Sequence, residues 1–144
     1  MECPQVAHQE HPKGKRIIVI DPSRIIRTLL TINLRQAGHQ VITAATVFEG
    51  MEMLKWLQCE PPDVIFLAMH TEQQHDDFEV LRYIQRHPLY SGLPLILMMT
   101  QEDSERGQLR QLVRRHAPCL IKPFQMSEVL SLVPPVERRT WEVQ

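Results

Sequence analysis

The chain has 144 residues, of which 43% are hydrophobic, and 16 basic residues nearly balance 17 acidic ones. This length suits one domain with one hydrophobic core, and the balance excludes a global attraction to nucleic acid or to an anionic membrane. No apolar stretch approaches the roughly 18 residues of a membrane span, and the first eight residues do not resemble a signal peptide. Cys3, Cys59 and Cys119 show no CxxC spacing, which favours a reducing compartment and a cytoplasmic location.

The sequence divides into three parts. Residues 1–13 are polar and predict a flexible N-terminal tail, residues 14–133 predict the domain, and residues 134–144, which begin with two prolines, predict a C-terminal tail or linker. Five short apolar runs lie within the domain, at 16–20, 40–44, 63–68, 93–99 and 119–121. Runs that are apolar throughout are typical of strands covered on both faces.

Helical patterns separate these runs. Ser23 is a predicted N-cap and Gly38 a predicted stop for the first helix, and Thr46 is a predicted N-cap for the second. The apolar residues that follow the first cap are Ile25, Ile26, Leu29, Leu30 and Leu34, and the second helix is predicted to bury Val47, Met51, Leu54 and Trp56. Further helices are predicted from about 77 to before Pro88, over 103–115 and over 125–132.

Alternation of strands and helices at this spacing predicts right-handed crossovers and a five-stranded, doubly wound parallel sheet of the flavodoxin-like (βα)5 class. In such sheets, functional groups gather beyond the carboxyl ends of the strands. Asp21 follows the first strand, Ala68 ends the third, Thr100 follows the fourth and Lys122 follows the fifth. Each residue alone is typical of a turn or cap, but together they predict one pocket.

Residues 16–133 resemble the receiver domain of two-component response regulators, the family of the chemotaxis response regulator. The matching segments are 17–27 (IIVIDPSRIIR), 62–67 (PDVIFL), 76–81 (DDFEVL), 93–100 (LPLILMMT) and 120–124 (LIKPF). The resemblance implies a role in phosphorelay signalling. It also implies a cis bond between Lys122 and Pro123 that would place the lysine amine on a phosphoryl group.

The departures from the family pattern concern the phosphoacceptor pocket. Receivers have two adjacent acids after the first strand, which hold Mg²⁺ together with the acceptor aspartate. Here the second acid is Pro22, and the acceptor position falls on Ala68. A methyl group cannot accept a phosphoryl group. The aromatic switch position is Cys119, and Met99 competes with Thr100 for the role of the hydroxyl residue.

These departures predict a degenerate receiver, or pseudo-receiver. We expect Mg²⁺ binding to be weak or absent, with Asp21 as a weak candidate ligand, and we expect no other cofactor and no catalytic residue. Lys122, lacking the acceptor, is predicted to pair with Asp21. The predicted function is phosphorylation-independent protein docking within a two-component pathway.

An arginine stripe suggests where docking occurs. Arg106, Arg110 and Arg114 recur every four residues on the predicted fourth helix, although such a stripe is often only the solvated face of a helix. In the family, the fourth helix, fifth strand and fifth helix dock a protein partner or a second copy. We expect no nucleic-acid partner, because no aromatic residues interleave with the basic ones, and no membrane.

Two alternatives remain open at this point. A displaced carboxylate among Glu72, Asp76 and Asp77 would make the chain a phosphorylatable receiver, although a solvated acidic loop is the simpler interpretation. His70 and His75 in the same loop lack a recognisable metal-ligand spacing and are interpreted as solvated. A small-anion-binding flavodoxin-like module is the other alternative, against which the glycine-free loop 21–27 argues.

Overall fold

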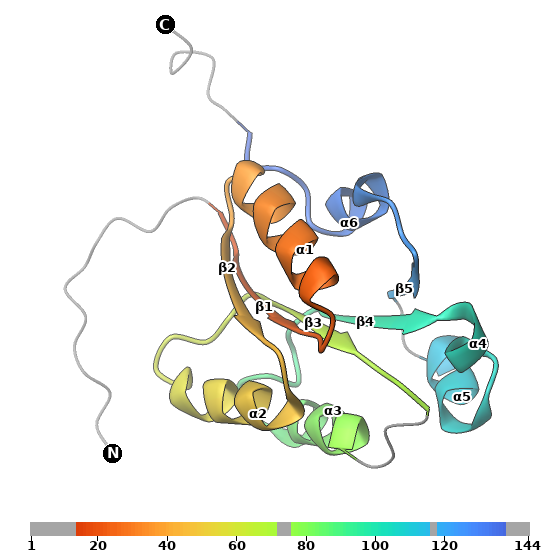
Figure 1. Ribbon diagram of the computed structural model, residues 1–144. Helices are drawn as coiled ribbons and strands as arrows, with labels where there is room; N and C mark the ends of the chain where they lie inside the picture. The colour runs from red at the N-terminus through yellow and green to blue at the C-terminus, as the bar shows by residue number, and fades with distance from the viewer. Residues whose placement is uncertain (1–13, 72–75, 116–117, 138–144) are drawn as a thin grey trace, which may run out of the picture.

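The protein is a five-stranded parallel sheet with helices on both faces, as the sequence predicts (Figure 1). The computed structural model describes residues 14–71, 76–115 and 118–137. The strand order is β2-β1-β3-β4-β5. The strands are β1 (Arg16–Ile20), β2 (Gln40–Ala44), β3 (Val64–Ala68), β4 (Leu95–Thr100) and β5 (Cys119–Lys122).

The helices form two layers around this sheet. They are α1 (Arg24–Gln36), α2 (Val47–Trp56), α3 (Asp76–Arg86), α4 (Gln101–Ser104), α5 (Gly107–Arg115) and α6 (Met126–Leu132). Helices α1 and α6 cover one face, α2 and α3 cover the other, and α4 and α5 lie beside the β4–β5 edge (Figure 1). None of these described helices is long and apolar enough to cross a membrane.

The sheet separates two hydrophobic clusters because successive strand residues point to opposite faces. Ile18 and Leu67 belong to the cluster under α2 and α3, whereas Val19, Phe66 and Ala68 belong to the cluster under α1 and α6. Burial on both faces explains why the strands read as continuous apolar runs. Ala68 therefore ends a strand that is buried along its whole length.

Local capping signals are confirmed. The Ser23 hydroxyl accepts a hydrogen bond from the Ile26 amide, and the Thr46 hydroxyl accepts one from the Glu49 amide, at the starts of α1 and α2. Gly38 follows α1 with a φ of +96°, a conformation that side chains rarely tolerate. The first strand–helix connection, which contributes Asp21 to the pocket, is therefore fixed by its own sequence.

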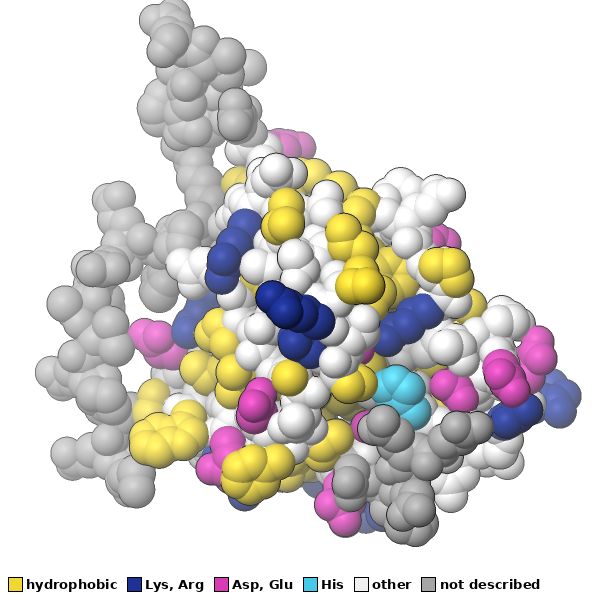
Figure 2. Space-filling model, in the orientation of Figure 1, with side chains coloured by type: hydrophobic (Ala, Val, Ile, Leu, Met, Phe, Trp, Pro, Cys, Tyr) yellow, Lys and Arg dark blue, Asp and Glu magenta, His cyan; other side chains and the backbone are white. Residues whose placement is uncertain are grey.

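The predicted burial of Trp56 is wrong, and the apolar pattern of α1 extends beyond its buried face. Ile25 and Leu29 are 72% and 44% exposed, and Trp56, the last residue of α2, is 78% exposed. Only a stripe of each helix contacts the sheet, and in α1 the fully buried residues are Leu30 and Leu34. Figure 2 shows hydrophobic side chains over α1 with basic side chains between them.

The predicted fourth helix is two helices. A turn at residues 105 and 106 separates α4 from α5, and Gly107 begins α5 with a φ of +50°. The reason is local, because this positive φ interrupts the regular helical backbone. Arg106 therefore lies in the turn and does not share a helix with Arg110 and Arg114.

One histidine joins the two ends of the described domain. The Lys15 amide donates to Nδ1 of the buried His39 at 3.0 Å, which leaves the proton on Nε2 to donate to the Pro134 carbonyl at 2.9 Å. The Val136 amide also donates to the Ala37 carbonyl. The start of the predicted C-terminal tail thus packs on the end of α1, whereas residues 138–144 and the predicted N-terminal tail lie outside the described residues.

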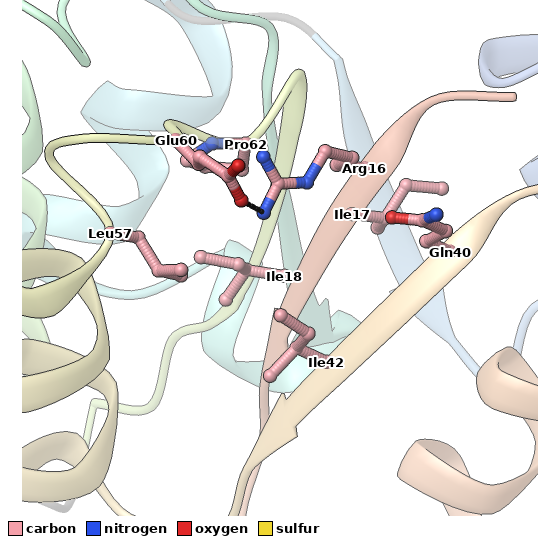
Figure 3. Close-up of a pocket in the computed structure, with 8 residues that line it drawn as sticks. All are labelled: Arg16, Ile17, Ile18, Gln40, Ile42, Leu57, Glu60 and Pro62. Atoms are coloured by element: carbon pink, nitrogen blue, oxygen red, sulfur yellow. Dashed lines mark ion pairs between the residues drawn. The ribbon is translucent and has the colours of Figure 1, made fainter. Parts of the chain in front are cut away.

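A small cavity lies beside the first residue of β1, at the end of the sheet away from the predicted pocket. Its volume is about 10 Å³, enough for no more than one water molecule. Arg16 and Glu60 form an ion pair of 3.2 Å beside it (Figure 3). The cavity is lined by Arg16, Ile17, Ile18, Gln40, Ile42, Leu57, Glu60 and Pro62.

Candidate functional site

The carboxyl ends of the strands bring the four predicted pocket residues to one rim. Asp21 follows β1, and Ala68, Thr100 and Lys122 are the last residues of β3, β4 and β5. In the parallel register, Thr100 lies opposite Lys122, and Ala68 lies opposite Met98. These four residues therefore lie at the same edge of the sheet, as the order of strands and helices predicts.

The side chain, the backbone amide and the carbonyl of Asp21 each form a hydrogen bond. Its side chain is 0% exposed, and its Oδ1 atom accepts a hydrogen bond of 2.8 Å from the Ser23 amide. Its backbone amide donates to Ala44, and its carbonyl accepts from the Arg27 guanidinium at 2.8 Å. The carboxylate therefore has a fixed position beneath the rim.

Lys122 neutralises this buried carboxylate. Its Nζ atom lies 2.7 Å from Oδ2 of Asp21, and its side chain is 15% exposed. The predicted ion pair is confirmed. The bond between Lys122 and Pro123 is cis, as the family resemblance implied. The lysine amine is thus directed to Asp21 at the centre of the pocket.

The acceptor position and the position of the second acid carry no side-chain oxygen. Ala68 is buried and packs in the cluster under α1 and α6, where its side chain presents only a methyl group. Pro22 is exposed and has no carboxylate. The acceptor position and the second acidic position are therefore both apolar.

The residues present do not fit Mg²⁺. This ion needs oxygen ligands in near-octahedral geometry, usually including one or two carboxylates. Among the described residues, the site offers only the carboxylate of Asp21, whose Oδ1 accepts from the Ser23 amide and whose Oδ2, which accepts no hydrogen bond, faces the Lys122 ammonium at 2.7 Å. Within the described ranges, no group of three or more His, Cys, Asp or Glu side chains could hold a metal ion.

The loop after β3 contains a pair that the sequence did not reveal. Oδ2 of Asp77 accepts a hydrogen bond of 2.8 Å from the His70 amide and lies 3.2 Å from its Nδ1. Asp77 is only 3% exposed, so the interpretation of these two residues as solvated is wrong. The hydrogen bond with Asp77 raises the pKa of His70 above its ordinary value, while burial acts in the opposite direction.

The next residue ties the same loop to α4. The Thr71 hydroxyl donates to Oδ1 of Asp103 at 2.5 Å, and the Asp103 amide donates to the Thr100 hydroxyl at 3.1 Å. Burial acts to raise the pKa of Asp103, but hydrogen bonds with Thr71 and Thr100 outweigh it and lower this pKa. Thr100 therefore caps α4 at the rim, whereas its competitor Met99 is buried in the core.

Other predicted residues are less closely tied to the pocket. Cys119 is half-buried against the cluster under α2 and α3, and burial raises the pKa of its thiol. Arg106 forms an ion pair with Glu102, whereas Arg110 and Arg114 are exposed on α5. The predicted three-residue stripe on one helix is therefore wrong.

Two of the loop residues considered in the sequence, Glu72 and His75, lie outside the described residues. Of Asp76, only the backbone at the start of α3 is described. The pairing of His70 with Asp77 spans this loop, and no local motif identifies it. The only available signal was an acid at position 77, where the family has glycine.

Comparisons with known proteins agree with this fold. Residues 17–134 match the model of the response regulator receiver domain. The chain is 35% identical over 127 residues to the alkaline phosphatase synthesis transcriptional regulatory protein PhoP of Bacillus subtilis. It is 30% identical over 125 residues to the DNA-binding dual master transcriptional regulator RpaA of Synechocystis. These matches cover 88% and 87% of the chain but only 50% of each relative.

A solved structure supports the fold. The chemotaxis response regulator CheY4 of Vibrio cholerae superimposes with a TM-score of 0.68 at 23% identity. The likeness covers 83% of this chain and 96% of that one. Since the family model spans most of the sequence, from β1 to the end of α6, the chain belongs to the response regulator receiver family.

Proposed function

We propose that this receiver domain acts in two-component signalling as a phosphorylation-independent protein-docking module, without catalytic turnover of its own. One observation carries the proposal. The acceptor position is the buried methyl group of Ala68, and the Nζ atom of Lys122 is already paired with Asp21 at 2.7 Å.

The chemistry of phosphoryl transfer supports this proposal. An aspartyl phosphate forms when a carboxylate oxygen attacks phosphorus, and the transfer depends on positioned cations that neutralise the developing charge. Ala68 supplies no nucleophile, and Pro22 supplies no second acid for Mg²⁺. The nucleophile and the second acid are therefore missing, and the Lys122 ammonium is already paired with Asp21.

A displaced acceptor is the alternative within the same family. Among the loop carboxylates, Asp77 is described, and its Oδ2 atom receives two contacts from His70. It is buried and serves to hold the loop on α3. This arrangement favours a structural role for Asp77 and supports the docking proposal.

Docking would then use the surface of the domain. The α5–β5–α6 face remains our proposed docking surface, with Arg110 and Arg114 exposed on it, for a protein partner or a second copy. PhoP and RpaA are named as transcriptional regulators, and the chain spans about half the length of each. An output domain is therefore a further proposed partner.

The proposal is tested by amide-resolved NMR of the full chain during titration with Mg²⁺ and then acetyl phosphate. We expect no shifts near Asp21, Thr100 or Lys122, and no phosphoryl group in the intact mass. The double variant Pro22→Asp/Ala68→Asp is the positive control and should gain Mg²⁺-dependent shifts. Shifts in the unmodified chain that extend from the rim to α5 would contradict the proposal.

A further inference from the structure

A groove between α2 and α3 lies away from the rim. Its volume is about 480 Å³, within the range of sites that hold a ligand or several side chains. Met51 lines it from α2, and Arg82, Tyr83 and Arg86 line it from α3. The lining comes from these two helices and the turn after α3, so the groove is open to solvent on its other sides.

The α3 side of the groove is one helical stripe. Glu79, Arg82, Tyr83 and Arg86 follow one another at spacings of three, one and three residues, which places them on one face of the helix. Met51 lines the groove from α2, and both Met51 and Tyr83 also pack against the core cluster under α2 and α3. The groove therefore has an apolar floor and a rim with two guanidinium groups, Arg82 and Arg86, and one carboxylate, Glu79.

Three aromatic rings pack together at this end of α3, tilted against one another. The His87 ring lies 5.3 Å from the ring of Tyr83 and 4.5 Å from that of Tyr90. Tyr90 is fully buried and its hydroxyl donates to the Leu54 carbonyl of α2. The His87 Nδ1 atom accepts from the Leu89 amide, which leaves its Nε2–H as a donor at the groove. A floor that contains the Tyr83 and His87 rings suits an apolar side chain from a partner.

The charges at the rim lack partners in the described part of the chain. Arg82 and Arg86 are exposed, and neither guanidinium forms an ion pair or hydrogen bond with another described residue. Two like charges four residues apart on a helix repel each other. Carboxylates from a partner would relieve this repulsion, and guanidinium groups bind carboxylates in bidentate geometry.

We propose that the α2–α3 groove binds an acidic segment of a protein partner, in which an apolar or aromatic side chain is flanked by carboxylates. The open shape favours a peptide segment, because small-molecule sites enclose most of their ligand. The apolar side chain contacts Tyr83 and Met51, and the carboxylates contact Arg82 and Arg86. This inference rests on the proposed docking function and adds to the α5–β5–α6 face a second docking surface with a stated partner chemistry.

The experiment titrates the ¹⁵N-labelled full chain with the peptide acetyl-Asp-Glu-Leu-Phe-Glu-Asp-amide. We expect saturable amide shifts at Met51 and over residues 79–90, with none at Lys122. The double variant Arg82→Gln/Arg86→Gln should weaken binding about tenfold or more, as for two lost charge-assisted contacts. Peptides with Lys for each acid, or with Gly-Ser for Leu-Phe, should bind less well.

The matched control is Lys15→Gln/Arg24→Gln, which removes two exposed positive charges that lie outside the groove and outside the α5–β5–α6 face. It should leave peptide affinity unchanged, and urea unfolding verifies that both double variants are folded. Absence of shifts at millimolar peptide, or equal binding by the Lys peptide, overturns the inference. Peptide binding that depends on Arg110 and Arg114 rejects the groove but retains the docking function. Phosphorylation of a residue at the rim would contradict the phosphorylation-independent docking function, whether or not the peptide binds.

Discussion

Replacement of Asp21 by Asn tests the ion pair at the centre of the pocket. Asp21→Asn keeps an oxygen that can accept the Ser23 amide, and it removes only the negative charge that faces Lys122. The lysine side chain, 15% exposed, then holds a charge with little access to water. We expect a large loss of folding free energy with no change in the fold.

The magnitude follows from the burial of the two partners. Breaking a buried ion pair costs about 3–5 kcal/mol, since it leaves one charge uncompensated. The cost here should be near the lower limit, about 3 kcal/mol, because the flexible lysine can move toward solvent. Asp21→Ala also removes the acceptor for Ser23 and should cost about 1 kcal/mol more.

Urea unfolding followed by circular dichroism measures these losses. Asp63→Asn is the matched control, because exposed Asp63 accepts an amide hydrogen bond of 2.8 Å from Arg16 but has no buried charge partner. Asp21→Asn/Lys122→Met removes both charges and should recover much of the stability, with a coupling of about 2 kcal/mol. A loss below about 0.5 kcal/mol for Asp21→Asn, or additive losses in the double variant, would refute the reasoning.

Three further predictions concern other parts of the domain. Pairing with a carboxylate on α3 raises the folded-state pKa of His70 above 6.5. Protonated His70 therefore stabilises the folded protein below pH 6.5, and this stabilisation is lost as pH rises through the raised pKa. The urea midpoint of His70→Gln should therefore change less between about pH 5.5 and 8.5 than that of the unmodified chain, and equal changes would contradict this. In Gly50→Ala, the added Cβ would lie 2.8 Å from the Ile20 side chain, which should destabilise the protein by about 1 kcal/mol, whereas Gly92→Ala has open space and should be neutral. Tyr90→Phe removes a buried hydrogen bond to α2 and should cost about 1 kcal/mol in thermal or urea unfolding; in the unmodified chain, burial raises the pKa of Tyr90 to about 12.

The sequence predicted those features that depend on local signals or on sheet topology. Ser23 and Thr46 cap their helices through their own hydroxyl groups, so their roles can be inferred from a few neighbouring residues. The pocket was predictable because parallel strands bring their carboxyl ends together. The pairing of Lys122 with Asp21 then followed from the absence of a carboxylate at position 68.

The features that were not predicted depend on tertiary geometry. Ile25 and Leu29 have the spacing of core residues, but α1 rests on the sheet through a narrower stripe. The pairing of His70 with Asp77 connects the two ends of the segment between β3 and α3, and hydrophobic periodicity carries no information about this pairing. The break before Gly107 depends on a positive φ that a glycine permits but does not require.

The hydrogen bonds of His39 with Lys15 and Pro134, which form a bridge beside the start of β1, determine which contacts would break first under mechanical tension. Lys15 and Pro134 bind the two nitrogens of the His39 ring, so both ends of the described chain meet at one corner (Figure 1). Tension applied between these ends would load two hydrogen bonds before it reached β1, which β2 and β3 hold from either side. Because the pocket with Lys122 lies at the opposite end of the sheet, such a force would leave it undisturbed until the bridge had opened.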